Sequence, residues 1–247
     1  MSGYEAFAGY YDRLTDNVDY EKRAAYFYGI LREHGGGGGI LLDLACGTGS
    51  MSVLMAGYGY DVIGVDASGD MLAGAQNKAL EQGRGVLFLC QRMQELDLYG
   101  TVNAAICTLD SINHLTSVRD VRETFRRVSM FLEPGGVFVF DMNTVYKHRR
   151  VLADNAFVYD TGDVYCVWQN QLDESTDTVR ITLDFFEEDG GAYDRTTESF
   201  AERSYKTEDV VAWLEEAGLS VLDVFGEMTR EEPLPDAERI VIAARKQ

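Results

Sequence analysis

Short apolar runs alternate with amphipathic stretches along residues 40–140. The apolar runs are predicted as β-strands and occupy residues 40–44, 62–65, 86–90, 104–108 and 137–140. The stretches between them carry apolar side chains at helical spacing, which predicts helices at about residues 50–58, 68–82 and 118–132. Strands that are apolar on both faces and separated by helices indicate a parallel sheet covered on both sides. We therefore expect a doubly wound α/β fold.

A further amphipathic helix is predicted before the first strand, over residues 19–34. Asp19 is placed to cap its N-terminus, and Gly35 follows its last residue. The side chains that recur on one face of this segment are apolar: Ala24, Phe27, Ile30 and Leu31.

The alternation changes after residue 141. Strand-like stretches at residues 164–172, 178–187 and 193–204 are joined by the turn-rich DEST and EDGG, which predicts an antiparallel meander. A helix over residues 207–217, capped by Thr207, and strands at residues 220–226 and 239–244 then follow. We expect a mostly parallel, seven-stranded Rossmann-like sheet from residues 1–144 and 205–247. Residues 145–204 are expected to form the inserted antiparallel β meander, as a lid or substrate subdomain.

Charge restricts the class of partner. The 247 residues carry a formal net charge of −19, which would repel the phosphate backbone of DNA or RNA. The first eight residues lack the basic and apolar regions of a signal peptide, and no later segment has the length of a membrane-spanning helix. We expect a cytoplasmic protein that binds neither nucleic acid nor membrane.

The cysteines and histidines indicate neither disulfides nor a metal. Three of the four cysteines sit in apolar strand-like runs, which is typical of reduced core residues; the four are Cys46, Cys90, Cys107 and Cys166. The histidines have no metal-ligand spacing and no cysteine partners: His34, His114 and His148.

A glycine-bracketed turn follows the first predicted strand. Gly47 and Gly49 permit a sharp turn and let a ligand approach the main chain, although a Gly-x-Gly turn alone is a weak signal. Asp66 ends the next strand, where an acid can accept both hydroxyls of a ribose. No third glycine continues the turn, as a dinucleotide site requires, and no Gly-Lys-Ser/Thr makes a phosphate loop. A nucleoside without a pyrophosphate fits this pattern best.

The motifs Asp43-Leu44-Ala45-Cys46-Gly47-Thr48-Gly49 and Val65-Asp66-Ala67-Ser68 resemble those of the class I S-adenosylmethionine-dependent methyltransferases, of the small-molecule, methyltransferase-domain 25-like type. Two further segments are similar to parts of that family. YEAFAGYYD at residues 4–12 resembles the entry segment, and DSINHL at residues 110–115 resembles the loop after the fourth strand. The resemblance covers most of the chain.

The resemblance implies a set of residues that bind S-adenosyl-L-methionine. Residues 45–49 would line its amino-acid end, Asp66 would hold the ribose, Ala67 and Met71 would flank the adenine, and Tyr11 would close the site. The full set is Tyr11, Asp43, Ala45, Cys46, Gly47, Gly49, Asp66, Ala67, Met71, Gln91, Arg92, Met93, Leu109 and Asp110. Relatives often carry an acid at the position of Arg92. Without it, adenine recognition would rest on Gln91 or the main chain of Met93.

Methyl transfer requires few catalytic side chains, because positioning of the donor and acceptor and exclusion of water supply most of the rate enhancement. His114 is the best placed base, with capping or loop hydrogen bonding as the structural alternative. Asp110 is a second catalytic candidate, and Asp141 and Asn143 could orient an acceptor. The basic run at residues 147–150 is predicted as a solvated loop or as an attraction for an acidic substrate.

Three functions are compatible with these patterns. The first is a methyltransferase that acts on a small-molecule acceptor, as a monomer or homodimer. The second is a non-catalytic S-adenosylmethionine-binding regulatory module, which Arg92 and the lack of an obvious base would suit. The third is a nicotinamide-dependent oxidoreductase, which the missing third glycine disfavours.

Overall fold

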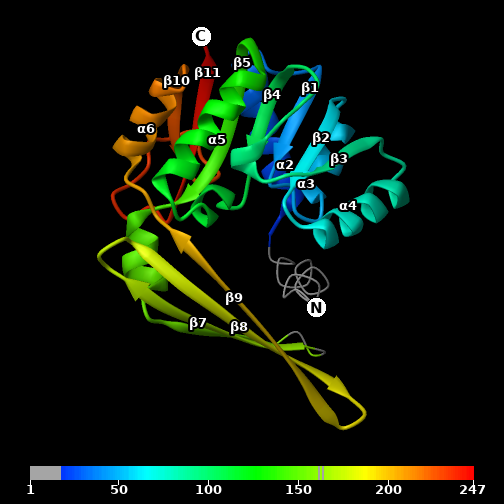
Figure 1. Ribbon diagram of the computed structural model, residues 1–247, viewed down its shortest axis with the longest axis vertical. Coiled ribbons are helices and arrows are strands. Elements are labelled where there is room, and N and C mark those ends of the chain that lie inside the picture. Colours follow the sequence, from blue (N-terminus) through cyan, green and yellow to red (C-terminus); the bar gives the residue numbers. More distant parts are fainter. Residues whose placement is uncertain (1–17, 161, 163) are drawn as a thin grey trace.

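Residues 18–160, 162 and 164–247 are described by the computed structural model, in which they form two sheets (Figure 1). The larger has seven strands in the order β10-β11-β5-β4-β1-β2-β3. Neighbours among β1 to β5 pair in parallel, whereas β11 pairs antiparallel with both β5 and β10. The strands are β1 (Ile40–Leu44), β2 (Asp61–Asp66), β3 (Val86–Cys90), β4 (Val102–Cys107), β5 (Leu132–Asn143), β10 (Leu219–Gly226) and β11 (Arg239–Lys246). The predicted mostly parallel Rossmann-like sheet is confirmed.

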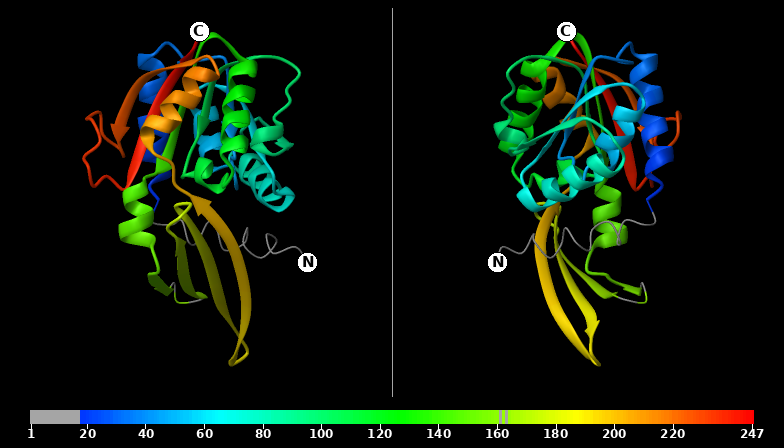
Figure 2. Two further views of the ribbon diagram at one scale, coloured as in Figure 1. Left: turned by 60° about the vertical axis from the view of Figure 1, so that its left-hand side comes forward. Right: turned by 90° about the vertical axis from the view of Figure 1, so that its right-hand side faces the viewer.

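Helices cover both faces of this sheet, so its strands are apolar on both sides (Figures 1 and 2). On one face lie α2 (Tyr20–Glu33) and α3 (Ser50–Gly57), beside α4 (Gly69–Glu81), which contacts α3 and β3. On the other face lie α5 (Val118–Phe131) and α6 (Thr207–Glu216). In the described part of the chain, no helix combines the length and apolar character needed to cross a membrane.

The start of α2 follows the prediction closely. Asp19 is its N-cap, and the carboxylate accepts a hydrogen bond from the main-chain N–H of Lys22 at 3.0 Å. The four apolar residues predicted on one face are fully buried against the sheet.

The smaller sheet, here called the lid sheet, contains β6 (Ala156–Asp160), β7 (Val164–Asp173), β8 (Thr178–Asp189) and β9 (Ala192–Arg203). Successive strands pair antiparallel. The lid sheet extends away from the carboxyl ends of the parallel strands (Figure 1). The meander is confirmed, but β6 was not predicted as a separate strand, because this five-residue edge strand is mostly exposed and lacks an apolar run.

Three local predictions were wrong. Residues Lys147–Leu152 form a short π-helix, η3, and not a solvated loop, because His148 and Leu152 are buried within it. The N-cap of α6 is Lys206, whose side chain makes no capping bond, and Thr207 is the first helical residue. Cys90 is exposed at the end of β3 and is not a core residue.

Candidate active site

The loop after β1 has an unusual backbone. Ala45, Gly47 and Gly49 all have positive φ values, of 57°, 53° and 75°. A Cβ at Gly47 would meet nothing within 4 Å, so the main chain there is open to the adjoining space. A Cβ at Gly49 would lie 2.8 Å from the Cβ of Ala75 in α4. Gly47 therefore exposes main chain, whereas Gly49 permits close packing of α4.

Asp66 is held at the end of β2 by two main-chain donors. Its Oδ2 accepts from the N–H of Gly47 and its Oδ1 from the N–H of Ser68, each at 2.9 Å. A carboxylate oxygen has two lone pairs, so each oxygen retains capacity for a further hydrogen bond. Asp66 thus presents a fixed acceptor pair beside the open main chain of Gly47.

A cavity of about 620 Å³ lies at the carboxyl ends of β1 to β4. Ten residues predicted from the sequence line it: Ala45, Gly47, Asp66, Ala67, Met71, Gln91, Arg92, Met93, Leu109 and His114. Six lining residues were not predicted: Ser68, Gly69, Asp70, Gln94, Ser111 and Leu115. Each of the six is within two positions of a predicted residue in the sequence. Their proximity to those residues in the chain is the signal that could have identified them.

Four predicted residues do not line this cavity: Asp43, Cys46, Gly49 and Asp110. Tyr11 lies outside the described residues. Asp43 is buried beneath the loop, where its Oδ2 accepts from Ser52 Oγ at 2.5 Å. Burial, together with the charge of Asp66, raises the pKa of Asp43 to about 7.

The loop after β3 presents side chains that differ in their hydrogen bonding. The amide of Gln91 bonds its own loop, donating to the carbonyl of Asp97 at 3.0 Å and accepting from its N–H at 2.9 Å. Arg92 is exposed at the cavity edge and lies in the N-cap position of η1 (Met93–Glu95). The side chain of Gln91 is therefore already occupied.

The loop after β4 holds two consecutive residues in the left-handed region, Leu109 at φ 57° and Asp110 at φ 52°. The carboxylate of Asp110 accepts from Arg239 Nη1 at 2.7 Å and from Asn143 Nδ2 at 2.6 Å. Burial alone would raise the pKa of Asp110, but the charges of Arg239 and Lys147 outweigh it and lower the pKa to about 2. Asp110 is thus an ionised anchor for this loop.

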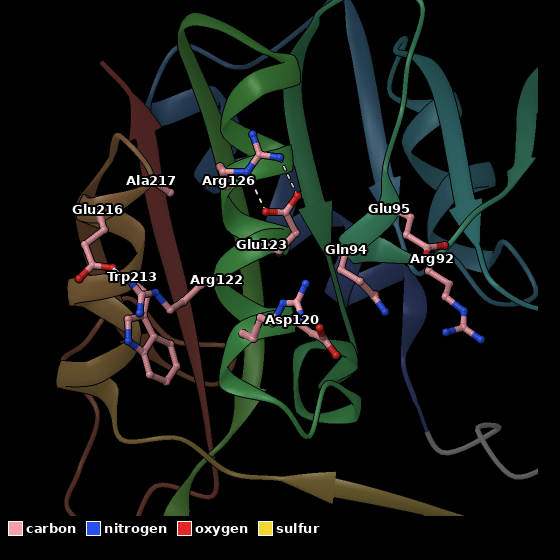
Figure 3. A pocket seen from close by; sticks show the side chains of 11 residues that line it. Arg92, Gln94, Glu95, Asp120, Arg122, Glu123, Arg126, Trp213, Glu216 and Ala217 are labelled. Atoms are coloured by element: carbon pink, nitrogen blue, oxygen red, sulfur yellow. Dashed lines mark hydrogen bonds and ion pairs between the residues drawn. The ribbon is translucent and has the colours of Figure 1, made fainter.

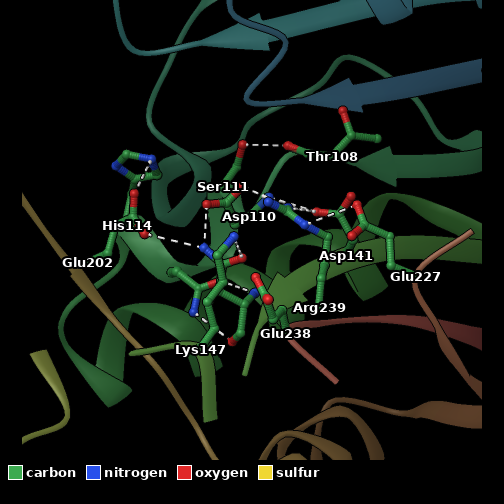
Figure 4. Close-up of polar contacts among 12 residues, drawn as sticks. Thr108, Asp110, Ser111, His114, Asp141, Lys147, Glu202, Glu227, Glu238 and Arg239 are labelled. Carbon is green, nitrogen blue, oxygen red and sulfur yellow. Dashed lines mark hydrogen bonds and ion pairs between the residues drawn. The ribbon is translucent and has the colours of Figure 1, made fainter. Parts of the chain in front are cut away.

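A buried charge network connects this loop to three other elements (Figure 4). Asp141, at the end of β5, accepts from Arg23 of α2 at 2.7 Å and from Arg239 of β11 at 3.0 Å. It also accepts from the main-chain N–H of Asp110 at 2.6 Å. Glu227 accepts from Arg23 at 2.6 Å. Asp141 therefore orients the protein's own loop, and the sequence contains no local signal for its distant arginine partners.

His114 ends the short helix η2 (Ser111–His114) and stands between the cavity and the lid sheet (Figure 4). Its side chain is 41% exposed, and its Nε2 lies 3.6 Å from Oε1 of Glu202 on β9. Its ring lies 5.3 Å from the ring of Phe200. Burial, followed by repulsion from Asp110, raises the pKa of Glu202 to about 7. Sequence reasoning missed Glu202, because its face of β9 also carries Glu198 and offers no local signal that singles it out.

A second cavity, of about 730 Å³, lies between η1, α5 and α6 and shares Arg92 and Gln94 with the first (Figure 3). Two of its arginines are paired with acids of its own wall, Arg122 with Glu216 and Arg126 with Glu123, each at 2.6 Å. Both arginines are about half exposed on the solvent-facing side of α5. This cavity contains no counterpart of the open loop and fixed carboxylate found at the strand ends.

Comparisons with known proteins converge on one activity. The family described as a methyltransferase domain matches residues 41–136. The chain is 33% identical over 244 residues to the putative methyltransferase YqeM of Bacillus subtilis (strain 168), covering 98% of this chain and 97% of that protein. It is 31% identical over 198 residues to a glycine/sarcosine N-methyltransferase of Parasynechococcus marenigrum (strain WH8102), covering 76% and 67%.

A solved structure agrees along nearly the whole chain. The crystal structure of an S-adenosylmethionine-dependent methyltransferase from Clostridium acetobutylicum ATCC 824 matches with a TM-score of 0.90 and 33% identity, covering 98% of each chain. The agreement therefore includes both the large sheet and the lid sheet.

Proposed function

The chain belongs to the class I S-adenosylmethionine-dependent methyltransferases, and we propose that it methylates a small-molecule acceptor bound between the strand ends and the lid sheet. The observation that carries this proposal is the position of His114. It lines the cavity at the strand ends and also contacts the inner face of β9. An acceptor held at His114 would lie between the two sheets.

The cavity residues fit the methyl donor. The main chain at Gly47 is open, and Asp66 retains hydrogen-bonding capacity for two hydroxyls. When bound, S-adenosylmethionine supplies an electrophilic methyl group on a sulfonium. We assign the ribose to Asp66, the adenine to the wall formed by Ala67, Met71 and the loop after β3, and the amino-acid end to residues 45–49.

Gln91, Arg92 and Met93, which follow β3, differ in whether they are free to bind the adenine. Because the amide of Gln91 already bonds Asp97, we infer that the main chain of Met93 and the exposed Arg92 contribute more than Gln91 does. We assign Asp43, Cys46, Gly49 and Asp110, which do not line the cavity, to supporting the loops that do.

The lid sheet, in residues 145–204, is proposed as the acceptor-binding subdomain and the remainder as the donor-binding domain. A small acceptor is supported by the relative named glycine/sarcosine N-methyltransferase, which covers 76% of this chain. His114 is proposed as the group that takes a proton from the acceptor.

The experiment uses S-adenosylmethionine labelled in its methyl group. A cell extract is separated by ultrafiltration into small-molecule and macromolecular fractions, and each is incubated with the enzyme. Label is expected in the small-molecule fraction, and Asp66→Ala serves as the control that cannot hold the donor. Label transferred only to protein or RNA would refute the small-molecule acceptor and leave the methyltransferase assignment standing.

A further inference from the structure

Glu202 is a buried carboxylate at the junction between the lid sheet and the strand ends. It is 5% exposed and is the second-to-last residue of β9, before the chain continues to α6. Its Oε1 faces His114 Nε2 at 3.6 Å, and its Oε2 lies 3.5 Å from Asn143 Nδ2 and 3.9 Å from His148 Nε2 (Figure 4). A lid residue therefore stands directly behind the proposed proton acceptor.

The negative charge of Glu202 has no full cationic partner among the described residues. The nearby cations are bonded elsewhere: Lys147 donates to Asn143 Oδ1 at 3.0 Å, and Arg239 pairs with Asp110 and Asp141. His148 is neutral above mildly acidic pH, because burial lowers its pKa to about 4. A buried carboxylate without a partner is costly, so a cation supplied by a ligand would be stabilising here.

The adjoining surface of β9 suits a cation as well. Glu198, Phe200 and Glu202 alternate along the strand and therefore face the same side of the sheet. Glu198 is 8% exposed, and its Oε1 has no hydrogen-bond partner within the described residues. An aromatic ring between two acidic residues favours a cation, because the ring face attracts it by a cation–π interaction and the carboxylates attract it by their negative charge.

We propose that His114 and Glu202 form an acceptor subsite for an amine: Glu202 orients the imidazole and attracts the ammonium form, and His114 removes its proton. This inference rests on the proposed function and narrows its substrate class. The proton passes from the ammonium to the imidazole, and the lone pair left on nitrogen forms the bond to the methyl carbon. The carbon–sulfur electron pair stays on sulfur, so atoms and charge balance. Glu202 acts through His114 and is a positioning residue.

The first test compares two ligands of equal shape, choline and its neutral carbon analogue 3,3-dimethylbutan-1-ol. Binding is measured by calorimetry with the demethylated product S-adenosylhomocysteine present. Choline is expected to bind roughly tenfold more tightly than the analogue in the native enzyme. Equal affinity for the two ligands would overturn the proposal without any variant being needed.

The second test removes the charge of Glu202. Glu202→Gln is expected to lose most of the choline preference while its affinity for S-adenosylhomocysteine stays unchanged, which also shows that it folds. Glu202→Asp keeps the charge and is expected to retain part of the preference. The matched control is Asp223→Asn, which breaks the His34–Asp223 pair of 2.8 Å outside the site. An unchanged preference in Glu202→Gln would overturn the proposal.

The third test uses pH, because the charge of choline is fixed. Choline affinity is expected to increase as pH rises through about 7, where Glu202 becomes ionised. The groups facing Glu202 are His114 from η2, Asp110 from the β4 loop, Lys147 and His148 from η3, and Arg239 from β11. The increase should be smaller in Glu202→Gln. An identical pH profile in that variant would exclude Glu202 as its source.

Methyl transfer separates this inference from the proposed function. A panel of primary and secondary amines is compared with alcohols of the same carbon skeleton. Transfer to amines supports the subsite. Transfer only to alcohols would overturn it while leaving a small-molecule acceptor in place, whereas transfer only to macromolecules would overturn the proposed function itself.

Discussion

The proposed donor side and the proposed acceptor side of the candidate active site are built differently. The donor side consists of main chain around Gly47 and one carboxylate, Asp66, both from consecutive β–loop–α units. The acceptor side gathers side chains from the β4 loop, η3, β9 and β11 around Glu202 and Asp110. Local backbone conformation determines the first, and long-range charge pairing determines the second. Variants should therefore affect the two sides separately.

The largest effect is expected on the acceptor side, from Arg239→Met. Loss of this guanidinium leaves Asp110 without its ion pair and Asp141 with only one of its two, and breaking a buried pair costs about 3–5 kcal/mol. The free energy of unfolding is measured in urea by circular dichroism. The control is Arg245→Met on the same strand, which loses one hydrogen bond to a main-chain carbonyl and about 1 kcal/mol. Equal losses would contradict the importance of the buried network.

On the donor side, Asp66→Ala should weaken binding of S-adenosylhomocysteine by at least about a hundredfold. Two hydrogen bonds to a charged group are lost, each contributing about 1.5–3 kcal/mol. Calorimetry measures the affinity. Asp61→Ala, at the exposed opposite end of the same strand, should bind as the native protein does. Unchanged affinity in Asp66→Ala would remove the basis for the ribose assignment.

Substitution of the two glycines in the loop after β1 should have different effects: the larger loss of stability is expected at Gly49 and the larger loss of ligand affinity at Gly47. Gly49→Ala brings a methyl group to 2.8 Å from Ala75 and should reduce the unfolding free energy by about 1–3 kcal/mol. Gly47→Ala has open space, so its stability loss should be limited to the left-handed backbone cost of about 1 kcal/mol. Ligand affinity should fall more in Gly47→Ala. The reverse ranking in stability would argue against their distinct roles.

Stability should also depend on pH through His148. Its pKa in the folded protein is about 4, below the ordinary 6.5, so the unfolded chain binds more protons between these values. Stability should therefore rise with pH from about 4 to 6.5, and His148→Gln should lose that part of the rise. Urea unfolding at several pH values measures it, with His34→Gln as control. Parallel stability curves for the native protein and His148→Gln would show that His148 is solvated.

Sequence patterns located the elements of the main sheet well. The predicted bounds of β1 and β3 agree with the structure, because each is a short apolar run that ends where turn residues begin. The prediction of secondary structure failed where a segment of polar composition is partly buried. η3 was missed because its basic sequence suggests solvent, yet contacts with β7 and β8 bury His148 and Leu152.

The loop after β1 could be located from sequence because its characteristic residues are nearly consecutive. Ten predicted residues line the cavity, and the predicted Gly47 and Asp66 are joined by a hydrogen bond. Glu202 could not be found in the same way. It is far from His114 in the chain, and the two side chains meet only because β9 packs against η2.

The amino-acid sequence by itself determined the parallel sheet, its covering helices and the bare main chain to which we assign the methyl donor, because periodicity and glycine conformations are local properties. Tertiary structure alone decided which charges meet. Arg23, Asp141 and Arg239 pair, and Glu202 stands behind His114, because strand order and the returning lid bring together residues that no local pattern relates.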